Sequence, residues 1–193
     1  KSKLAEFITV EREHVLGAGQ DMDVVLAGPG LGRDQAAASL LKSLFQKYPQ
    51  KKYVLDADAL KLVKPTSIPA NSVITPHSQE FKELFGLAAT EGNLKKISQE
   101  YGFVIVLKGK TDYVAQAGNI KKNIAGNAGM TKGGTGDVLA GLVAGLAALN
   151  DPELAARAAV FLCGLAGDRL AKRKSFMYSA SELIGEVPKV YRH

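Results

Sequence analysis

Cysteine is almost absent from this chain, because Cys163 is the only one among 193 residues. A single thiol excludes an intrachain disulfide and a metal cluster built from cysteines. Its apolar setting, "AVFLCGLAG", favours a buried structural thiol over a nucleophile. The chain also lacks an apolar run long enough to span a membrane, and its first residues, "KSKLAEFITVEREH", lack the apolar core of a signal peptide. We therefore expect a soluble protein of the cytoplasm that does not act at a membrane.

Basic tracts and clustered aromatic residues are scarce as well. The 25 Lys and Arg residues outnumber the 19 Asp and Glu residues and give a net charge of +6, but the lysines are scattered or occur in pairs. This distribution favours solvated surface lysines over a nucleic-acid interface, and it agrees equally well with attraction to a small polyanion such as a nucleotide. The length and the hydrophobic content of 46% predict a single domain over residues 1–193.

Short β-rich runs alternate with amphipathic helical segments in the first half of the chain. The predicted strands are "EFITV", "DVVLAG", "KYVLDA", "SVITP" and "FVIVLKG". Several are apolar at consecutive positions, as in strands that are covered on both faces. Helices are expected after Asp34, from "TPHSQEFKELF" with Thr75 as the cap and Pro76 in the first turn, and over about Leu94 to Tyr101.

The pattern changes after "VIVLKG". The segment "KTDYVAQAGNIKKNIAG" predicts a small β-hairpin around "AGN". Helices follow from Asp137 to about Leu149, from "DPEL", and after a capping box formed by Ser179 with Glu182. The alternation predicts an α/β fold with a doubly wound, mostly parallel sheet and helices on both faces. Ligands in such sheets bind beyond the carboxyl ends of the strands.

Glycines surround the predicted start of the helix "VLAGLVAGLAAL". Gly133, Gly134, Thr135 and Gly136 directly precede Asp137, and the helix is apolar or small on every side, so we expect it to be buried. A buried helix start leaves backbone N–H groups without partners, and the helix dipole adds about half a positive charge there. An anion site is therefore favoured over a tight turn in which Asp137 is a simple cap.

Two familiar phosphate motifs are excluded. A P-loop needs its Gly-Lys-Ser/Thr after a spacer, whereas Lys132 precedes the glycines here. The dinucleotide fingerprint is not met by "GPGLGRD", because Arg33 occupies the third glycine position. Gly28, Gly30 and Gly32 in that segment fit either close approach of a ligand or a plain β-to-α turn.

Polar side chains follow the other predicted strands. Asp56 could help to position a metal or a ligand hydroxyl, although two carboxylates do not make a metal site. Asp58 fits a helix cap. His77 lies at the same edge with Glu80 one turn on, and a lone histidine is more often structural than functional. Lys108 fits either a phosphate contact or a snorkelling lysine, with Gly109 allowing backbone approach.

Together the motifs "GPGLGRD", "VLDADAL", "TPHSQEF", "VLKG" and "GNAGMTKGGTGDVLAG" resemble those of the ADP/ATP-dependent NAD(P)H-hydrate dehydratases, in the same order. That family belongs to the ribokinase-like superfamily, and the resemblance runs from about Val24 to Leu170. It implies a ribokinase-like fold, a homo-oligomer such as a tetramer, and dehydration of (6S)-NAD(P)HX to NAD(P)H. ADP or ATP would be the co-substrate, releasing AMP or ADP and phosphate, and Mg²⁺ would accompany the nucleotide.

The resemblance also implies roles for individual residues. The hydrate side would contain Gly28, Gly30, His77 and Glu80, and the nucleotide side would contain Lys108, Gly109, Lys110, Thr111, Asp112, Asn127, Gly133, Gly134, Thr135 and Gly136. Asp137 would lie between the two sides and take the proton of the hydrate's hydroxyl, and no residue is expected to be a direct metal ligand. In-line phosphoryl transfer needs such charge neutralisation and a positioned nucleophile.

The chain departs from the family in its N-terminal part. It starts near the family's second strand and lacks the usual first strand with its "GGS"-like turn and the "GAP"-like stretch that helps to hold the hydrate. Two other functions fit the same motifs: a ribokinase-like kinase for a small alcohol such as a vitamin precursor, and a non-catalytic nucleotide-binding module. "TPHSQE" and "DADAL" favour the dehydratase over the kinase.

Overall fold

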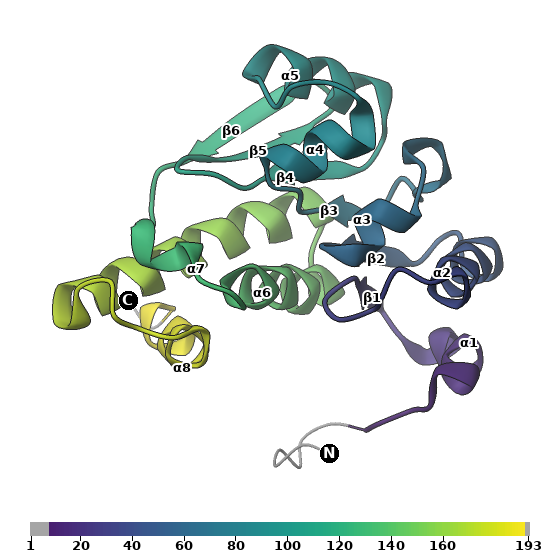
Figure 1. Cartoon of the computed structure of the whole chain (residues 1–193), viewed down its shortest axis with the longest axis horizontal. Helices are drawn as coiled ribbons and strands as arrows, with labels where there is room; N and C mark the ends of the chain where they lie inside the picture. The colour runs from purple at the N-terminus through teal and green to yellow at the C-terminus, as the bar shows by residue number, and fades with distance from the viewer. Residues whose placement is uncertain (1–7, 192–193) are drawn as a thin grey trace.

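The computed structural model of the chain describes residues 8–191, which form a six-stranded sheet flanked by helices (Figure 1). The strands lie side by side in chain order: β1 (Val24–Ala27), β2 (Lys52–Leu55), β3 (Val73–Ile74), β4 (Val104–Leu107), β5 (Asp112–Gln116) and β6 (Asn119–Asn123). Strands β1 to β4 are parallel, and β5 and β6 continue the sheet as an antiparallel hairpin. The predicted mostly parallel α/β sheet with a small hairpin is thus confirmed.

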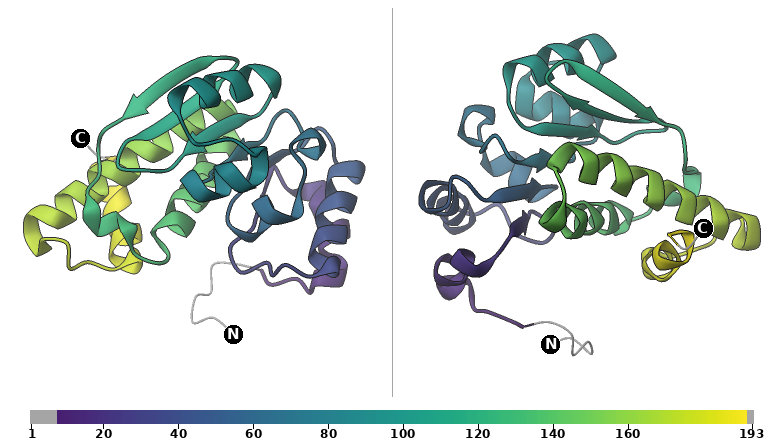
Figure 2. Two further views of the ribbon diagram at one scale, coloured as in Figure 1. Left: turned by 45° about the horizontal axis from the view of Figure 1, so that its top comes forward. Right: turned by 180° about the vertical axis from the view of Figure 1, so that it is seen from behind.

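The helices divide between the two faces of this sheet. They are α1 (Val15–Ala18), α2 (Gln35–Lys47), α3 (Asp58–Leu62), α4 (Ser78–Phe85), α5 (Glu91–Glu100), α6 (Thr135–Leu149), α7 (Pro152–Lys174) and α8 (Ala180–Val190), with short 3-10 turns at η1 (Arg12–His14), η2 (Gly19–Asp21), η3 (Pro65–Ser67) and η4 (Ala128–Thr131). Figure 2 shows α6 and α7 crossing one side of the strands, and α4 and α5 on the other side. Among residues 8–191, no helix combines the length and the apolar character needed to cross a bilayer.

Two separate cores follow from this arrangement, because successive side chains of a strand point to opposite faces. In β2, Tyr53 and Leu55 pack in the core beneath α2 to α5, whereas Val54 packs in the core beneath α6 to α8. Both cores are continuous along the sheet, which explains why the inner strands are apolar at consecutive positions. The Tyr53 hydroxyl further fixes β2, because it donates hydrogen bonds to the carbonyls of Leu44 and Tyr48.

Most of the predicted helix starts are confirmed. Asp34 caps α2 by accepting a hydrogen bond from the N–H of Ala37 at 2.7 Å. Asp151 caps α7, whose first residue is Pro152, and Ser179 forms the expected capping box at the start of α8.

Three local expectations are wrong. In the predicted strand "EFITV", residues 8–10 form no strand, and the other two residues lie outside the described range. Thr75 does not cap α4, because its side chain is buried at the end of β3, and His77 is the cap instead. Helix α6 is not buried all round: Asp137, Gly141, Gly145 and Leu149 recur every four residues on an exposed face, and Leu149 is 90% exposed.

Candidate functional site

The carboxyl ends of the parallel strands bring together four segments that are far apart in the sequence. The N–H of Asp56, after β2, donates to the carbonyl of Ala27 at the end of β1 at 3.1 Å. The N–H of Lys108, after β4, donates to the carbonyl of Pro76 at 2.8 Å, and His77 pairs with Lys108 in a parallel bridge. The predicted convergence of polar residues at this sheet edge is therefore confirmed.

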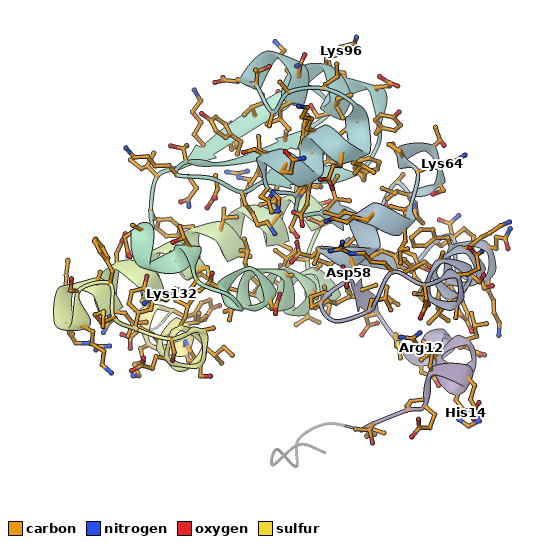
Figure 3. The ribbon with its side chains drawn as sticks, in the orientation of Figure 1. Arg12, His14, Asp58, Lys64, Lys96 and Lys132 are labelled. Atoms are coloured by element: carbon orange, nitrogen blue, oxygen red, sulfur yellow. The ribbon has the colours of Figure 1, made fainter. Side chains whose placement is uncertain are left out.

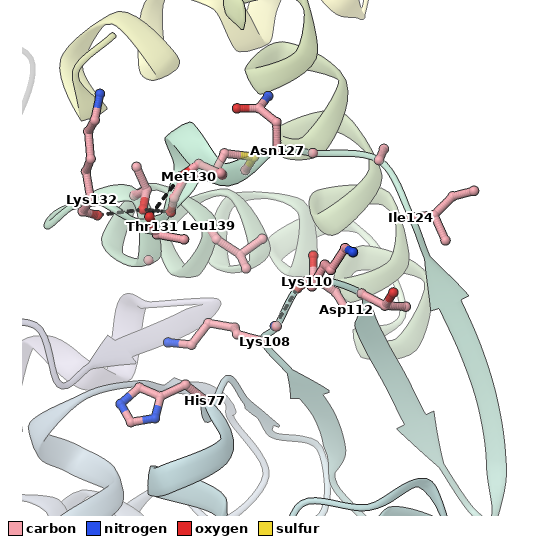
Figure 4. Close-up of a pocket in the computed structure, with 17 residues that line it drawn as sticks. His77, Lys108, Lys110, Asp112, Ile124, Asn127, Met130, Thr131, Lys132 and Leu139 are labelled. Atoms are coloured by element: carbon pink, nitrogen blue, oxygen red, sulfur yellow. Dashed lines mark hydrogen bonds between the residues drawn. The ribbon is translucent and has the colours of Figure 1, made fainter. Parts of the chain in front are cut away.

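A cavity of about 810 Å³ opens beside the end of β4 and the start of α6. Figure 4 shows His77 and Lys108 on one side of it and Asn127 and Met130 on the other. Its lining comprises His77, Lys108, Gly109, Lys110, Thr111, Asp112, Ile124, Ala125, Gly126, Asn127, Ala128, Met130, Thr131, Lys132, Thr135, Gly136 and Leu139. Its volume falls in the range of pockets that enclose cofactor-sized ligands.

Lys108 is held in a buried network of charges at one wall of the cavity. Its Nζ contacts Asp56 Oδ1 at 2.6 Å and lies 3.9 Å from Glu80 Oε2. The Asp56 side chain is 2% exposed and the Lys108 side chain 20% exposed. A Cβ atom on Gly136 would lie 3.6 Å from Nζ, so the ammonium sits beside the positive end of α6. Asp56 therefore balances the charge of the Lys108 ammonium, which the family resemblance had assigned to a nucleotide phosphate alone.

His77 caps α4 with its ring. The Nδ1 atom accepts hydrogen bonds from the N–H groups of Gln79 and Glu80, and Glu80 Oε2 accepts in turn from the N–H of His77 at 2.8 Å. Because Nδ1 accepts, the neutral ring carries its proton on Nε2, which lies 3.5 Å from Glu80 Oε1. The cap thus holds the ring edge of His77 beside a buried carboxylate that also lies near Lys108.

The turn from Lys108 to Asp112 is closed by a carboxylate. Asp112 Oδ1 accepts a hydrogen bond from the N–H of Gly109 at 3.1 Å, and Asn123 donates to Oδ2 at 3.5 Å. Burial raises the pKa of Asp112, and these hydrogen bonds oppose that shift only in part. Asp112 therefore shapes the turn, in which Gly109 and Lys110 are exposed on the cavity wall.

The glycines before α6 build the bend that ends at the helix start. Gly134 has a φ of 88° and stands at the cap position of α6, where a residue with a Cβ atom is disfavoured. The Thr135 hydroxyl donates a hydrogen bond that is shared between the carbonyls of Met130 and Lys132, and this closes the bend. Thr135 and Gly136 line the cavity, whereas Gly133 and Gly134 do not.

Several predicted site residues lie outside the lining of the cavity: Gly28, Gly30, Glu80, Gly133, Gly134 and Asp137. Gly28 is buried with a φ of 134°, and a Cβ atom there would lie 1.7 Å from the carbonyl oxygen of Asp56, so its observed role is close backbone packing. Gly30 is exposed and faces open space. Asp137 is exposed in the first turn of α6, one residue after Gly136.

The Asp58 side chain, which fitted a helix cap, is tied to other structural partners. Asp58 is the first residue of α3, not its cap, and it accepts hydrogen bonds from Arg33 at 2.6 Å and from the N–H of Gly32 at 3.2 Å. The hydrogen bond from Arg33 is the main cause that lowers the pKa of Asp58. Figure 3 shows Asp58 near β1 and well apart from Lys132.

Burial raises the pKa of Cys163 to about 12, which agrees with the structural thiol predicted from its apolar setting. Within residues 8–191, no group of three or more His, Cys, Asp or Glu side chains is arranged to hold a metal ion.

Comparison with known proteins identifies the group to which these motifs belong. A family model described as NAD(P)H-hydrate dehydratase matches residues 2–189. The bifunctional NAD(P)H-hydrate repair enzyme of Methanocaldococcus jannaschii is 40% identical over 182 residues, which is 93% of this chain and 35% of the relative. The ADP-dependent (S)-NAD(P)H-hydrate dehydratase of Enterococcus faecalis is 36% identical over 162 residues, which is 79% of this chain and 56% of the relative.

A solved structure of an NAD(P)H-hydrate dehydratase also resembles this chain. The ADP/ATP-dependent NAD(P)H-hydrate dehydratase of Bacillus subtilis, co-crystallized with ATP and Mg²⁺, superimposes with a TM-score of 0.80 at 27% identity and covers 88% of this chain and 64% of that one. The chain thus spans about a third to two thirds of the length of these relatives.

Proposed function

Because the chain belongs to the NAD(P)H-hydrate dehydratase family, we propose that it takes part in dehydrating NAD(P)H hydrate to NAD(P)H at the expense of ADP or ATP. The observation that carries this proposal is the cavity between the Lys108–Asp112 turn and the start of α6. The chain spans 35% and 56% of two curated relatives, so the proposal concerns the part of the reaction that this cavity can support.

The nucleotide phosphates would lie at the end of the cavity where Gly136 meets Lys108. Among the described residues no side chain caps α6, so its first-turn N–H groups and its dipole favour negative charge there, and the ammonium of Lys108 lies beside them. Because Asp56 already balances Lys108, the lysine would contribute a fixed donor more than an uncompensated charge. The apolar side chains of Ile124, Met130 and Leu139 line the same cavity and suit the base and sugar of the nucleotide.

Asp137 would serve as the base. Asp137 directly follows Gly136 in the first turn of α6 and is exposed, so its carboxylate would be open to a hydrate bound next to the proposed phosphate position. The hydroxyl oxygen of the hydrate would attack the terminal phosphorus, the bond from that phosphorus to the nucleotide would break, and Asp137 would take the hydroxyl proton. Cleavage of the C–O bond then releases phosphate with that oxygen, and the loss of a proton from the neighbouring ring carbon restores the double bond.

Mg²⁺ enters this proposal only as an ion that the nucleotide brings. The described residues form no cluster of three or more metal-ligating side chains, so nucleotide oxygens and water would supply most of its ligands. When bound, such an ion would neutralise phosphate charge.

The test compares wild-type protein with Asp137→Asn in an assay that follows recovery of NADH absorbance from its hydrate, with ADP and ATP in parallel. We expect the variant to lose turnover and to keep its nucleotide affinity within about twofold of wild type, because a base acts on the reaction more than on binding. Asp151→Asn is the matched control, since Asp151 is also an exposed aspartate at a helix start and an asparagine still caps α7.

Full turnover by Asp137→Asn would refute the role of Asp137. A stable phosphorylated product in place of NADH would indicate a kinase, and nucleotide binding without any turnover by wild type would indicate a binding module.

A further inference from the structure

The side chain of Asn127 is occupied by the protein itself. Its Oδ1 accepts hydrogen bonds from the Tyr178 hydroxyl at 2.8 Å and from the N–H of Gly129 at 3.0 Å, and its Nδ2 donates to Asp168 Oδ1 at 3.0 Å. Both acceptor positions of the amide oxygen and one of its two amide hydrogens are therefore used. The amide serves mainly to shape residues 125–132, all of which except Gly129 line one wall of the cavity.

Asp168 accepts hydrogen bonds from the same wall with both of its carboxylate oxygens. Oδ1 accepts from Asn127, and Oδ2 accepts from the N–H of Gly126 at 3.0 Å. Gly126 has a φ of 114°, which glycine adopts readily but residues with a side chain rarely do, so the hydrogen bond to Asp168 selects one of the several conformations open to this residue. Because Asp168 lies on α7, it ties the bend to one of the longest rigid elements of the fold.

The connection between α7 and α8 holds the wall from a second direction. Tyr178 is 2% exposed, and its ring lies so close to Gly129 that a Cβ atom there would come within 2.7 Å of it. Lys132 donates to the carbonyls of Phe176 and Tyr178, and its Nζ lies 5.3 Å from the centre of the Tyr178 ring. Figure 4 shows the Lys132 side chain directed away from Lys108, so its charge faces this connection and not the phosphate end.

We propose that Asp168 and Tyr178 are positioning residues for nucleotide binding, which act through Asn127 to hold residues 125–129 in their binding conformation. This inference rests on the proposed function, because it assigns the nucleotide to this cavity. Neither side chain lines the cavity, so neither needs to touch the ligand. Holding the wall in advance removes the cost of ordering it when the nucleotide binds.

Tyr178→Phe tests this inference, because it removes one hydroxyl and keeps the ring against Gly129. We expect the dissociation constant for ADP, measured by calorimetry, to rise about five- to tenfold, the effect of losing one hydrogen bond that positions a binding group. In turnover, the KM for ADP should rise while kcat stays within about twofold, whereas a smaller folded fraction would lower kcat and leave KM unchanged. Hydrogen exchange of residues 125–132 should become faster in the free variant.

Tyr53→Phe is the matched control. Tyr53 is also buried and also donates from its hydroxyl to carbonyls, but it packs in the core beneath α2 to α5, on the other face of the sheet. We expect it to lower stability without changing the affinity for ADP. Asp168→Asn should weaken ADP binding at least as much as Tyr178→Phe, because one carboxylate oxygen is replaced by a donor that faces another donor.

The outcomes separate this inference from the function on which it rests. Wild-type affinity for ADP in Tyr178→Phe, or an equal loss of affinity in Tyr53→Phe, overturns the positioning role and leaves the proposed function intact. Wild-type protein that binds neither ADP nor ATP overturns the proposed function, and the inference with it.

Discussion

Replacing Lys108 by methionine should destabilise the protein far more than its partial exposure suggests. The substitution keeps most of the apolar stem and removes the ammonium that Asp56 contacts at 2.6 Å. Asp56 is 2% exposed, so its carboxylate would stay buried without its cation. Removing one partner of a buried ion pair costs about 3–5 kcal/mol, and we expect a loss of that size in the free energy of unfolding measured with urea.

The same pair predicts an asymmetry between its two members. Asp56→Asn should cost about 1–2 kcal/mol, because the amide oxygen still accepts a hydrogen bond and Lys108, at 20% exposure, keeps contact with water. Lys122→Met is the matched control: its Nζ contacts Glu91 at 2.9 Å, but both side chains are 53% exposed, so the loss should stay below about 1 kcal/mol.

Equal losses of stability in Asp56→Asn and Lys108→Met would refute this asymmetry. A loss in Lys108→Met no larger than that in Lys122→Met would show that burial has no effect on the Lys108–Asp56 pair. A melting experiment gives an independent check, since each kcal/mol corresponds to about 2–4 °C for a chain of this size.

Two further predictions concern packing and pH. Gly28→Ala should destabilise severely, because its Cβ atom would meet the carbonyl of Asp56 at 1.7 Å, whereas Gly141→Ala, with nothing within 4 Å, should be neutral or stabilise by up to about 1 kcal/mol in urea unfolding. The Lys174 ammonium lowers the pKa of Glu182 from its ordinary value of 4.5 to about 2, so the stability that this carboxylate contributes is present above pH 4.5 and is lost as the pH falls toward 2. The difference in unfolding free energy between wild type and Glu182→Gln should therefore disappear across that window, and a difference that persists at its lower end would contradict the assignment.

Local patterns predicted the elements of the fold well, because capping and strand composition act over a few residues. Asp34, Asp151 and Ser179 all cap the helices that their sequences indicate. The exposed face of α6 was not predicted, because Gly141 and Gly145 were counted as apolar positions. A residue without a side chain gains little free energy from burial and tolerates solvent equally well.

The candidate site was harder to predict, because its partners are distant in sequence. The motif "VLKG" indicated Lys108, but no local signal pairs it with Asp56, which lies 52 positions away. Asp168 and Tyr178 were missed for the same reason, since each meets Asn127 across more than 40 residues of chain. The glycine-rich bend, in contrast, was found because the helix start and its glycines are consecutive.

The division of the sheet between two cores has a consequence for synthesis on the ribosome. The face that carries Tyr53 and Leu55 can be covered as soon as α2 to α5 have emerged, since these helices alternate with the strands that they cover. The face that carries Val54, Val73 and Val104 is covered by α6 to α8, which come last. Among the described residues, the helices that cover these valines therefore emerge only after residue 134, and until then chaperones or aggregation can compete for this face.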